Sequence, residues 1–573
     1  MYTITVNDLK INAKPGDTIL EVLKKEGIRI PTLCHIEGLT PTGACRVCVV
    51  ELVDQNRLVP SCSLQVYDNM IIDTHSQRAI NARKTIIELL LSNHPDDCLY
   101  CVRQGNCDLS NLAIEYGIRQ KRKNAISIDN KLDISSPSIV REENKCILCG
   151  KCVRICEEIQ GVSAIDFINR GYKSKITCAF NENINISSCI NCGQCVLVCP
   201  TGALSEKDNT ENVVDALNDK DRIVVVQYAP SVPLTIAEEF GIKPGIDATG
   251  LLNTSLKKLG FNYVFDTSFT ADLTIMEEAS ELVDRITNNK PLPMLTSCSP
   301  GWIKFVEQFY PDMIDNLSTC KSPQQMLGSI IKTYFAEKMN IDPAKIYSVS
   351  IMPCTAKKFE AQRPEHLLNG LPAVDTVLTT REASKLLKLH SIDLKNLTPS
   401  DTDLPFGSRS TAGKLFGVTG GVMEAALRTA HYLITGKEIT NLEIKELRGL
   451  DGVKEAELKI KNLNVKVAVV NGLLNARNIL EQVQNGEKNY HFIEIMTCPG
   501  GCINGGGQPI NIDKNNLKER MRGLYKIDKE ETIKFSHRNP LILDLYKEFL
   551  GKPLSEKSHK LLHTHYSERK VVI

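Results

Sequence analysis

The chain has 573 residues, a formal net charge of +1 and 24% charged residues. This length predicts several domains, and the balanced charge argues against nucleic acid or a membrane surface as a partner. No run of about eighteen apolar residues is long enough to cross a membrane. The residues after Met1 do not show the basic and hydrophobic segments of a signal peptide, so we expect a cytoplasmic protein.

Cysteine is the unusual component, with 21 residues. Many of the cysteines stand at metal-ligand spacings, and no export signal accompanies them, so metal ligation is favoured over disulfides. Soft thiolate ligands in this number favour iron–sulfur clusters over zinc.

Residues 1–78 predict a small α+β domain. Tyr2–Val6 and Leu9–Ala13 alternate like a hairpin, and a helical pattern with a capping residue follows from Asp17. The domain and its cysteine spacing resemble plant-type ferredoxins of the β-grasp fold, although the first gap between cysteines is longer than usual. The resemblance implies a 2Fe–2S cluster, with zinc as the alternative. The expected ligands are Cys34, Cys45, Cys48 and Cys62.

Residues 79–125 predict a second metal-binding domain, in which a helical run over Gln77–Ser92 precedes the ligand motif. One histidine and three cysteines would suit zinc as well as iron–sulfur. The position between two iron–sulfur modules favours a 4Fe–4S cluster with one histidine ligand. The candidate ligands are His94, Cys98, Cys101 and Cys107.

Residues 137–207 contain an internal repeat of four cysteines each, at the spacing of two-cluster bacterial ferredoxins. In that pattern the fourth cysteine of each run serves the other 4Fe–4S cluster. One predicted site is Cys146, Cys149, Cys152 and Cys199, and the other is Cys189, Cys192, Cys195 and Cys156. Cys178 is left over, and we expect an inert buried thiol.

Residues 201–220 are polar and read as a linker, and residues 220–573 predict one large α/β domain. Its expected strands are Ile223–Gln227, Tyr347–Ile351, Val465–Val470 and His491–Ile495. Its expected helices are Asp272–Thr287, Ser322–Lys338 and Val422–Thr435. The fold class is therefore multidomain, α+β and α/β.

Three motifs in the large domain place cysteine beside glycine, proline or methionine. They are Thr296–Trp302, Met352–Glu360 and Glu494–Gly507. The last holds two thiols four residues apart, which can reach one soft metal centre, and its glycines let backbone approach a bulky group. Each could be a buried structural thiol, but together they suggest loops that converge on one site.

These motifs resemble the signature motifs of iron–iron hydrogenases, and the order of the modules is similar to that of the large clostridial-type enzymes. The resemblance implies an H-cluster, which is a 4Fe–4S cubane bridged by a cysteine to a di-iron centre with carbonyl, cyanide and dithiolate ligands. Cys354, Cys498 and Cys502 would ligate the cubane, with Cys502 bridging. Lys357 would pair with a cyanide. The di-iron centre would be surrounded by Pro230, Ser231, Gln324, Met352, Lys357, Phe416 and Met496.

The family moves protons through acids and hydroxyls to a cysteine beside the di-iron centre. The matching residues here are Glu278, Arg285, Glu281, Ser318 and Cys298. Glu278 and Glu281 are three residues apart and share one face of a helix. The alternative is a solvated acidic face with an ordinary surface pair to Arg285.

The chain departs from the family at Cys298–Ser299, where two adjacent cysteines are usual. The first is the proton donor and the second ligates the cubane. Three alternatives follow for the fourth ligand. Ser299 could ligate through oxygen, a harder donor that alters the cluster potential, Cys298 could ligate at the cost of the relay, or Cys320 could fold back.

The resemblance implies reversible reduction of protons to hydrogen. The expected cofactors are one 2Fe–2S cluster, three 4Fe–4S clusters and the H-cluster, with electrons from ferredoxin or from NAD-linked flavin partner subunits. An electron-relay subunit of an NADH dehydrogenase-like complex would explain the N-terminal modules but not Met352–Cys354 or Cys498–Gly507. A hydrogen sensor and a hydrogenase-like assembly protein are further alternatives. Cys298 argues against the first and the N-terminal modules against the second.

Overall fold

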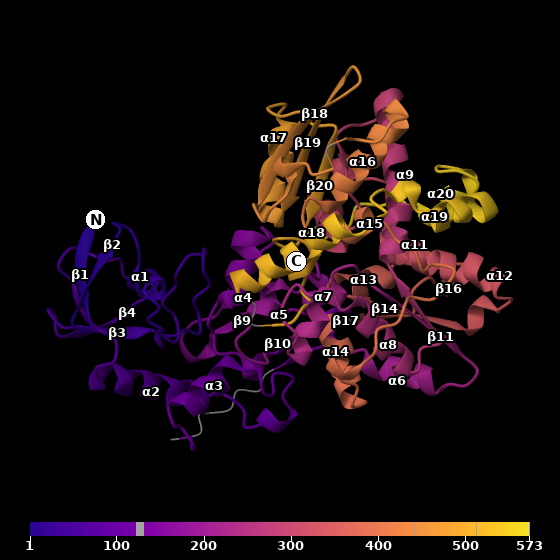
Figure 1. Ribbon diagram of the computed structural model, residues 1–573. Coiled ribbons are helices and arrows are strands. Elements are labelled where there is room, and N and C mark those ends of the chain that lie inside the picture. The colour runs from indigo at the N-terminus through magenta and orange to yellow at the C-terminus, as the bar shows by residue number, and fades with distance from the viewer. Residues whose placement is uncertain (122–130, 441, 511–512, 572–573) are drawn as a thin grey trace.

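The computed structural model describes residues 1–121, 131–440, 442–510 and 513–571. The N-terminal domain stands apart at the indigo end of Figure 1. The predicted hairpin is confirmed as β1 (Tyr2–Val6) paired antiparallel with β2 (Leu9–Ala13). Helix α1 (Ile19–Lys25) begins at a capping box formed by Thr18 and Glu21. The five-stranded sheet has the order β2-β1-β5-β3-β4, in which the other strands are β3 (Val49–Leu52), β4 (Arg57–Pro60) and β5 (Ile71–Asp73).

The second module is helical. The helix expected at Gln77–Ser92 is confirmed with those bounds as α2, and it packs against α3 (Asp108–Glu115) and β3. Residues 122–125, the end of the predicted second domain, lie outside the described residues.

The ferredoxin-like module repeats one local geometry. Helix α4 (Lys151–Arg154) follows Gly150 at φ +71°, and helix α5 (Gln194–Val198) follows Gly193 at φ +70°. Both glycines occupy the left-handed region that side-chain-bearing residues seldom adopt. The module's strands are β6 (Leu132–Asp133), β7 (Ile139–Glu142), β8 (Asp166–Ile168), β9 (Lys175–Thr177) and β10 (Leu204–Glu206).

The prediction of a linker over residues 201–220 is wrong. The segment contains β10 and helix α6 (Thr210–Asn218), and the side chains of Val213 and Ala216 are buried in the core of the next domain. These two positions are three apart, so they share one face of α6 while its polar residues face solvent. The high proportion of polar residues hid this narrow apolar stripe.

The C-terminal domain is built on two sheets. The first has the order β12-β11-β14-β17 and is parallel throughout. The second has the order β13-β20-β19-β18, and only β18 pairs antiparallel. The strand expected at residues 223–227 is confirmed as an almost wholly buried run, as expected for a central parallel strand. The strands are β11 (Ile223–Tyr228), β12 (Tyr263–Asp266), β14 (Ile346–Met352), β17 (Thr376–Thr379), β13 (Met294–Leu295), β18 (Val453–Ile460), β19 (Leu463–Asn471) and β20 (Phe492–Met496).

Helices cover these sheets, and the three predicted helical runs are confirmed. One run is interrupted by a π-helical turn at Ile331–Phe335, between α11 (Pro323–Ile330) and α12 (Ala336–Lys338). The C-terminal helices, yellow in Figure 1, pack on the same domain. Further helices of this domain include α7 (Val232–Ile236), α9 (Ser268–Thr287), α10 (Pro300–Phe309), α13 (Ala356–Ala361), α16 (Gly421–Thr435), α18 (Lys514–Glu530), α19 (Pro540–Leu545) and α20 (Glu556–Leu562).

Candidate active site and electron-relay centres

A cavity lies where three strands end. Cys298 follows β13, Cys354 follows β14, and Cys498 follows β20. Carboxyl ends of parallel strands are the usual place for a ligand in such domains. All three motifs expected to converge contribute to the lining of this cavity.

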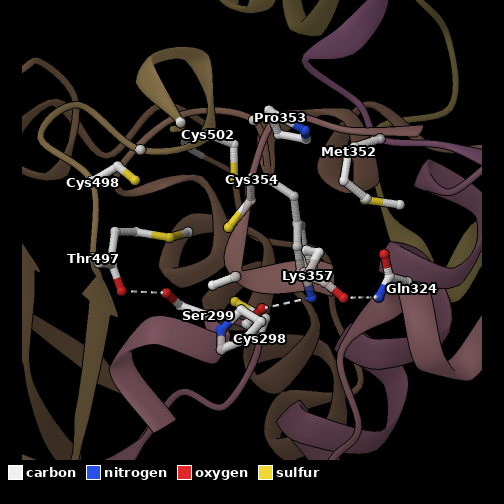
Figure 2. A pocket seen from close by; sticks show the side chains of 18 of the residues that line it. Cys298, Ser299, Gln324, Met352, Pro353, Cys354, Lys357, Thr497, Cys498 and Cys502 are labelled. Carbon is white, nitrogen blue, oxygen red and sulfur yellow. Dashed lines mark hydrogen bonds between the residues drawn. The ribbon is translucent and has the colours of Figure 1, made fainter. Parts of the chain in front are cut away.

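Thiols dominate one side of this cavity. In Figure 2, Cys354, Cys498 and Cys502 lie above, and Cys298, Ser299 and Lys357 lie below. Burial, then the charges of Cys354 and Lys357, set the pKa of Cys502, which is raised to about 12. Burial, followed by the charges of Cys354 and Cys502, also raises the pKa of the Cys498 thiol. Thiols crowded together in a dry site are poor neighbours unless a cation binds them. The donor set therefore fits a soft metal cluster.

Glycines shape the wall behind these thiols. A Cβ at Gly505 would lie 2.1 Å from Pro353 O, and one at Gly501 would lie 2.6 Å from Thr419 N. Gly501 also has φ +89°. The backbone of the last motif is therefore pressed against its neighbours, which brings the Cys498 and Cys502 loop close to Cys354.

The residues expected around a di-iron centre gather here, with one exception. Ser231 is not among the described residues that line the cavity; it is buried behind Gly417 and accepts a hydrogen bond from Gln508 Nε2 at 3.4 Å. The expected residues that line it are Pro230, Gln324, Met352, Lys357, Phe416 and Met496.

Lys357 is held by two partners. Its Nζ donates to Cys298 O at 3.1 Å and pairs with Glu360 Oε2 at 2.9 Å. Glu360 also accepts from Gln324 Nε2 at 3.0 Å, so one carboxylate orients both side chains. Sequence reasoning missed Glu360, although its spacing of three from Lys357 on α13 is a usable signal.

The three candidates for the fourth ligand lie in different places. Ser299 and Cys298 both line the cavity, and Ser299 Oγ is hydrogen-bonded to Thr497 Oγ1 at 2.8 Å (Figure 2). Cys320 is not among the described lining residues, and its Sγ lies 3.8 Å from Glu281 Oε2 instead. The geometry therefore favours Ser299 or Cys298 over Cys320.

Three of the expected relay residues are joined by hydrogen bonds. Arg285 Nη2 donates to Glu281 Oε1 at 2.7 Å, and Ser318 Oγ donates to Glu281 Oε2 at 2.9 Å. Glu278 Oε2, one helical turn away on the same helix as Glu281, is buried without a hydrogen-bond partner. Burial, followed by the charge of Glu278, raises the pKa of the Cys298 thiol.

The alternative of a solvated acidic face is wrong for these residues. Glu278 is 1% exposed and Glu281 is 7% exposed. Burial, followed by the charges of Glu281 and Glu494, raises the pKa of Glu278 to about 8. Arg285 is also buried, and its guanidinium donates to the carbonyl of Leu317 at 2.6 Å. Helical periodicity alone did not distinguish a buried acid from a solvated one.

The two predicted ferredoxin sites occupy separate cavities. Each draws three cysteines from one half of the repeat and one from the other. Cys192 lines both the second of these cavities and the large cavity of the three motifs. The first cavity is lined by Cys146, Cys149, Cys152 and Cys199, and the second by Cys156, Cys189, Cys192 and Cys195. Cys178 is buried and lines neither.

The four N-terminal cysteines that are predicted ligands lie together. The Cys34 thiol interacts with those of Cys45 and Cys62, and the Cys48 thiol interacts with that of Cys62. Cys34 and Cys45 share one apolar cluster with Cys149, a predicted ligand of the first ferredoxin site.

The predicted histidine-containing site borders the same ferredoxin centre. His94, Cys98 and Cys107 line one cavity, in which His94 is buried and Cys98 is exposed. Cys101 does not line that cavity, and a Cβ at Gly202 would lie 2.7 Å from its Sγ. Cys107 Sγ lies 3.6 Å from Pro200 O, next to Cys199.

Comparisons with known proteins decide the family. The chain is 47% identical, over 99% of both chains, to the NADP-reducing hydrogenase subunit HndD of Solidesulfovibrio fructosivorans. It is 41% identical to iron hydrogenase 1 of Clostridium pasteurianum, over 99% of this chain and 100% of the relative. The chain belongs to the iron–iron hydrogenase family. A solved variant of the FeFe-hydrogenase HydA1 from Chlamydomonas reinhardtii matches this hydrogenase with a TM-score of 0.57 and 43% identity, over 62% of this chain and 98% of that one.

Family profiles divide the hydrogenase into five matched regions. Residues 222–506 match the C-terminal domain of the iron-only hydrogenase large subunit, and residues 514–569 match the iron hydrogenase small subunit. Sequence reasoning treated both as one domain. Residues 1–77 match a 2Fe–2S cluster-binding domain, 83–122 an iron–sulfur binding region of NADH-ubiquinone oxidoreductase, and 136–205 the ferredoxin-like domain of NADH-quinone oxidoreductase subunit 3.

The predicted fold class, family and activity are confirmed. The chain is an oxidoreductase that interconverts protons and hydrogen, and it carries 2Fe–2S, 4Fe–4S and H-cluster domains. None of the described helices has the length and apolar character needed to cross a membrane.

Substitution of Ser299 separates the remaining ligand alternatives. If Ser299 is the fourth ligand, we expect Ser299→Ala to lower the iron content of the H-cluster domain, and Ser299→Cys to keep the iron but shift the cubane's reduction potential. Iron analysis and a spectroscopic redox titration measure both. Unchanged iron and potential in both variants, with iron loss in Cys298→Ala, would assign the ligand to Cys298 instead.

Proposed function

We propose that Cys354, Cys498, Cys502 and Ser299 hold the cubane of the H-cluster, with Cys502 as the bridging thiolate. The convergence of these donors on one cavity supports this assignment most directly. When bound, the H-cluster supplies the redox chemistry that joins two electrons and two protons as hydrogen. Lys357 and Gln324, both oriented by Glu360, offer donors to the anionic ligands of the di-iron centre.

On the proton side, we assign Cys298 as the donor at the cavity and Glu278 as the group that reloads it. Glu278 suits this role because its raised pKa lets it hold a proton near neutral pH. Ser318 Oγ donates to Glu281, and Glu281 also accepts from the buried Arg285. Lys357 fixes the Cys298 backbone by donating to its carbonyl.

On the electron side, the contacts support a branched relay through one 2Fe–2S and three 4Fe–4S clusters. The Cys34 centre and the His94 centre both border the Cys146–Cys199 site. Electrons would pass from there to the site that contains Cys192, which shares a wall with the catalytic cavity. The exposed Cys98 marks the His94 centre as one surface where electrons enter.

The electron partner is proposed from the relatives. Because the relative HndD is a subunit of an NADP-reducing hydrogenase, we propose a nicotinamide-linked partner subunit as donor, with ferredoxin as the second candidate. Anaerobic hydrogen evolution with reduced ferredoxin, compared with NADPH or NADH plus a flavin-bearing partner, discriminates the two.

The proposal is tested on chain that has been matured anaerobically and fully loaded with iron. We expect infrared bands of metal-bound carbonyl and cyanide, together with hydrogen turnover. Full iron loading without these bands would overturn the assignment of the cavity as an H-cluster site.

A further inference from the structure

Three potential metal ligands from distant parts of the chain meet beside the relay. They are Glu281, Cys320 and His563, all buried, and their ligand atoms lie within 4.8 Å of one another. Glu281 belongs to α9, Cys320 precedes α11, and His563 directly follows α20. An isolated antiparallel bridge pairs Cys320 with His563, which places their side chains next to each other.

We propose that Glu281, Cys320 and His563 form an inhibitory site for a soft divalent cation, best represented by Zn²⁺, that stops turnover by occupying the relay carboxylate. Thiolate, imidazole and carboxylate form a typical zinc ligand set, and three protein ligands leave a fourth position for water. Zinc bond lengths place tetrahedral ligand atoms about 3.5 Å apart. Cys320 Sγ and Glu281 Oε2 are already 3.8 Å apart. The proposal rests on the proposed role of Glu281 in the relay.

A second layer of contacts orients His563 as zinc sites require. Glu277 Oε2 lies 3.1 Å from His563 Nε2. Glu277 is fully buried and is itself fixed by Tyr546 OH at 2.5 Å and by the backbone N–H of Leu554 at 2.8 Å. A carboxylate on Nε2 favours the tautomer with the proton there, so Nδ1 is left to bind a metal. Nδ1 now faces Thr319 Oγ1 at 2.8 Å, on the side of Glu281.

Charge and access also suit a cation. Arg285 binds Glu281 Oε1, whereas Oε2 accepts from Ser318 Oγ at 2.9 Å and faces Cys320 Sγ. A thiolate and a carboxylate together balance two positive charges in a buried site. The exposed ring of His559 lies 4.3 Å from that of His563, so the site lies close to the protein surface.

The test uses matured holoenzyme with all clusters loaded, titrated with zinc chloride. Metal analysis after dialysis and zinc X-ray absorption report binding independently of activity. We expect one additional zinc per chain with one sulfur ligand, and inhibition of hydrogen turnover by the bound zinc. The matched control is Cys178→Ala, which removes a buried thiol outside the site and should keep the zinc and the inhibition.

Variants of the three ligand residues should lose both zinc binding and inhibition by zinc. In Cys320→Ala and in His563→Gln, each compared with its own zinc-free rate, we expect inhibition to need at least about 10-fold more zinc. Glu277→Gln should weaken zinc binding by about 10–100-fold, because it removes the carboxylate that orients His563. Infrared bands of the H-cluster confirm that each variant is assembled, and Cys320→Ser keeps the side-chain volume if Cys320→Ala fails to fold.

The outcomes are separable from those of the proposed function. No extra zinc, or equal zinc binding in Cys320→Ala and wild type, would overturn the site. Zinc bound through sulfur at Cys320 with unchanged turnover would overturn the inhibition and the role of Glu281 in the relay. Neither result bears on the H-cluster assignment, which depends on the carbonyl and cyanide bands.

Discussion

Replacement of Cys502 by alanine is expected to abolish hydrogen turnover and to remove the carbonyl and cyanide infrared bands. Cys502 would be the thiolate that joins the cubane to the di-iron centre. It lines the cavity from the loop between Gly501 and Gly505. Alanine offers no ligand atom, so the di-iron centre loses its covalent link to the protein.

The matched control for this prediction is Cys178→Ala, which removes a buried thiol from outside the cluster cavities. It should retain the infrared bands and the activity. Measurement of both variants after identical maturation distinguishes ligand loss from a general effect of removing a buried cysteine. Intact carbonyl and cyanide bands in Cys502→Ala would contradict the bridging assignment.

Replacement of Glu278 by glutamine is expected to lower hydrogen turnover by about 10²–10⁴-fold, the usual contribution of a positioned proton-transfer group. Glutamine keeps the size of the side chain but cannot exchange a proton between Ser318 and Cys298. The H-cluster bands and the iron content should stay unchanged, because Glu278 does not line the cavity.

The pH dependence of this carboxyl gives a second readout. Its pKa of about 8 in the folded chain lies above the ordinary 4.5, because burial and the charges of Glu281 and Glu494 disfavour the ionised form. The stability that the protonated carboxyl contributes is complete below pH 4.5 and is lost as pH rises through about 8. The infrared carbonyl stretch of a protonated acid should therefore disappear near pH 8 in wild type and be missing in Glu278→Gln.

Asp284→Asn is the control on the same helix, because Asp284 pairs at the surface with Lys290. It should keep wild-type turnover and the titrating carbonyl stretch. A turnover in Glu278→Gln equal to that of Asp284→Asn would remove Glu278 from the relay.

Local pattern was enough to predict much of the fold. The bounds of β1, β2 and α2 matched those predicted, because alternation and capping are set by neighbouring residues. The eight ferredoxin cysteines were grouped by the resemblance of their spacing to two-cluster bacterial ferredoxins, and the structure places the same groups in two cavities. Short-range signals of this kind need no knowledge of tertiary contacts.

The remaining features depended on contacts between distant residues. Thr497 hydrogen-bonds to Ser299, which lies 198 positions away in the sequence, and no local sequence pattern predicts this contact. The burial of Glu278 and Glu281 follows from packing of α9 against α11 and α16, which periodicity does not specify. The linker prediction at residues 201–220 failed for a related reason, since α6 is held by the domain that follows it.

The small-subunit-like segment at residues 514–569 is joined to the large-subunit-like domain by the chain itself. Helices α19 and α20 pack against α9 and α11, so this contact forms as an intramolecular event at high effective concentration. Dilution should therefore leave the segment docked. A single proteolytic cut between the two regions would turn the contact into a bimolecular equilibrium, in which assembly depends on protein concentration.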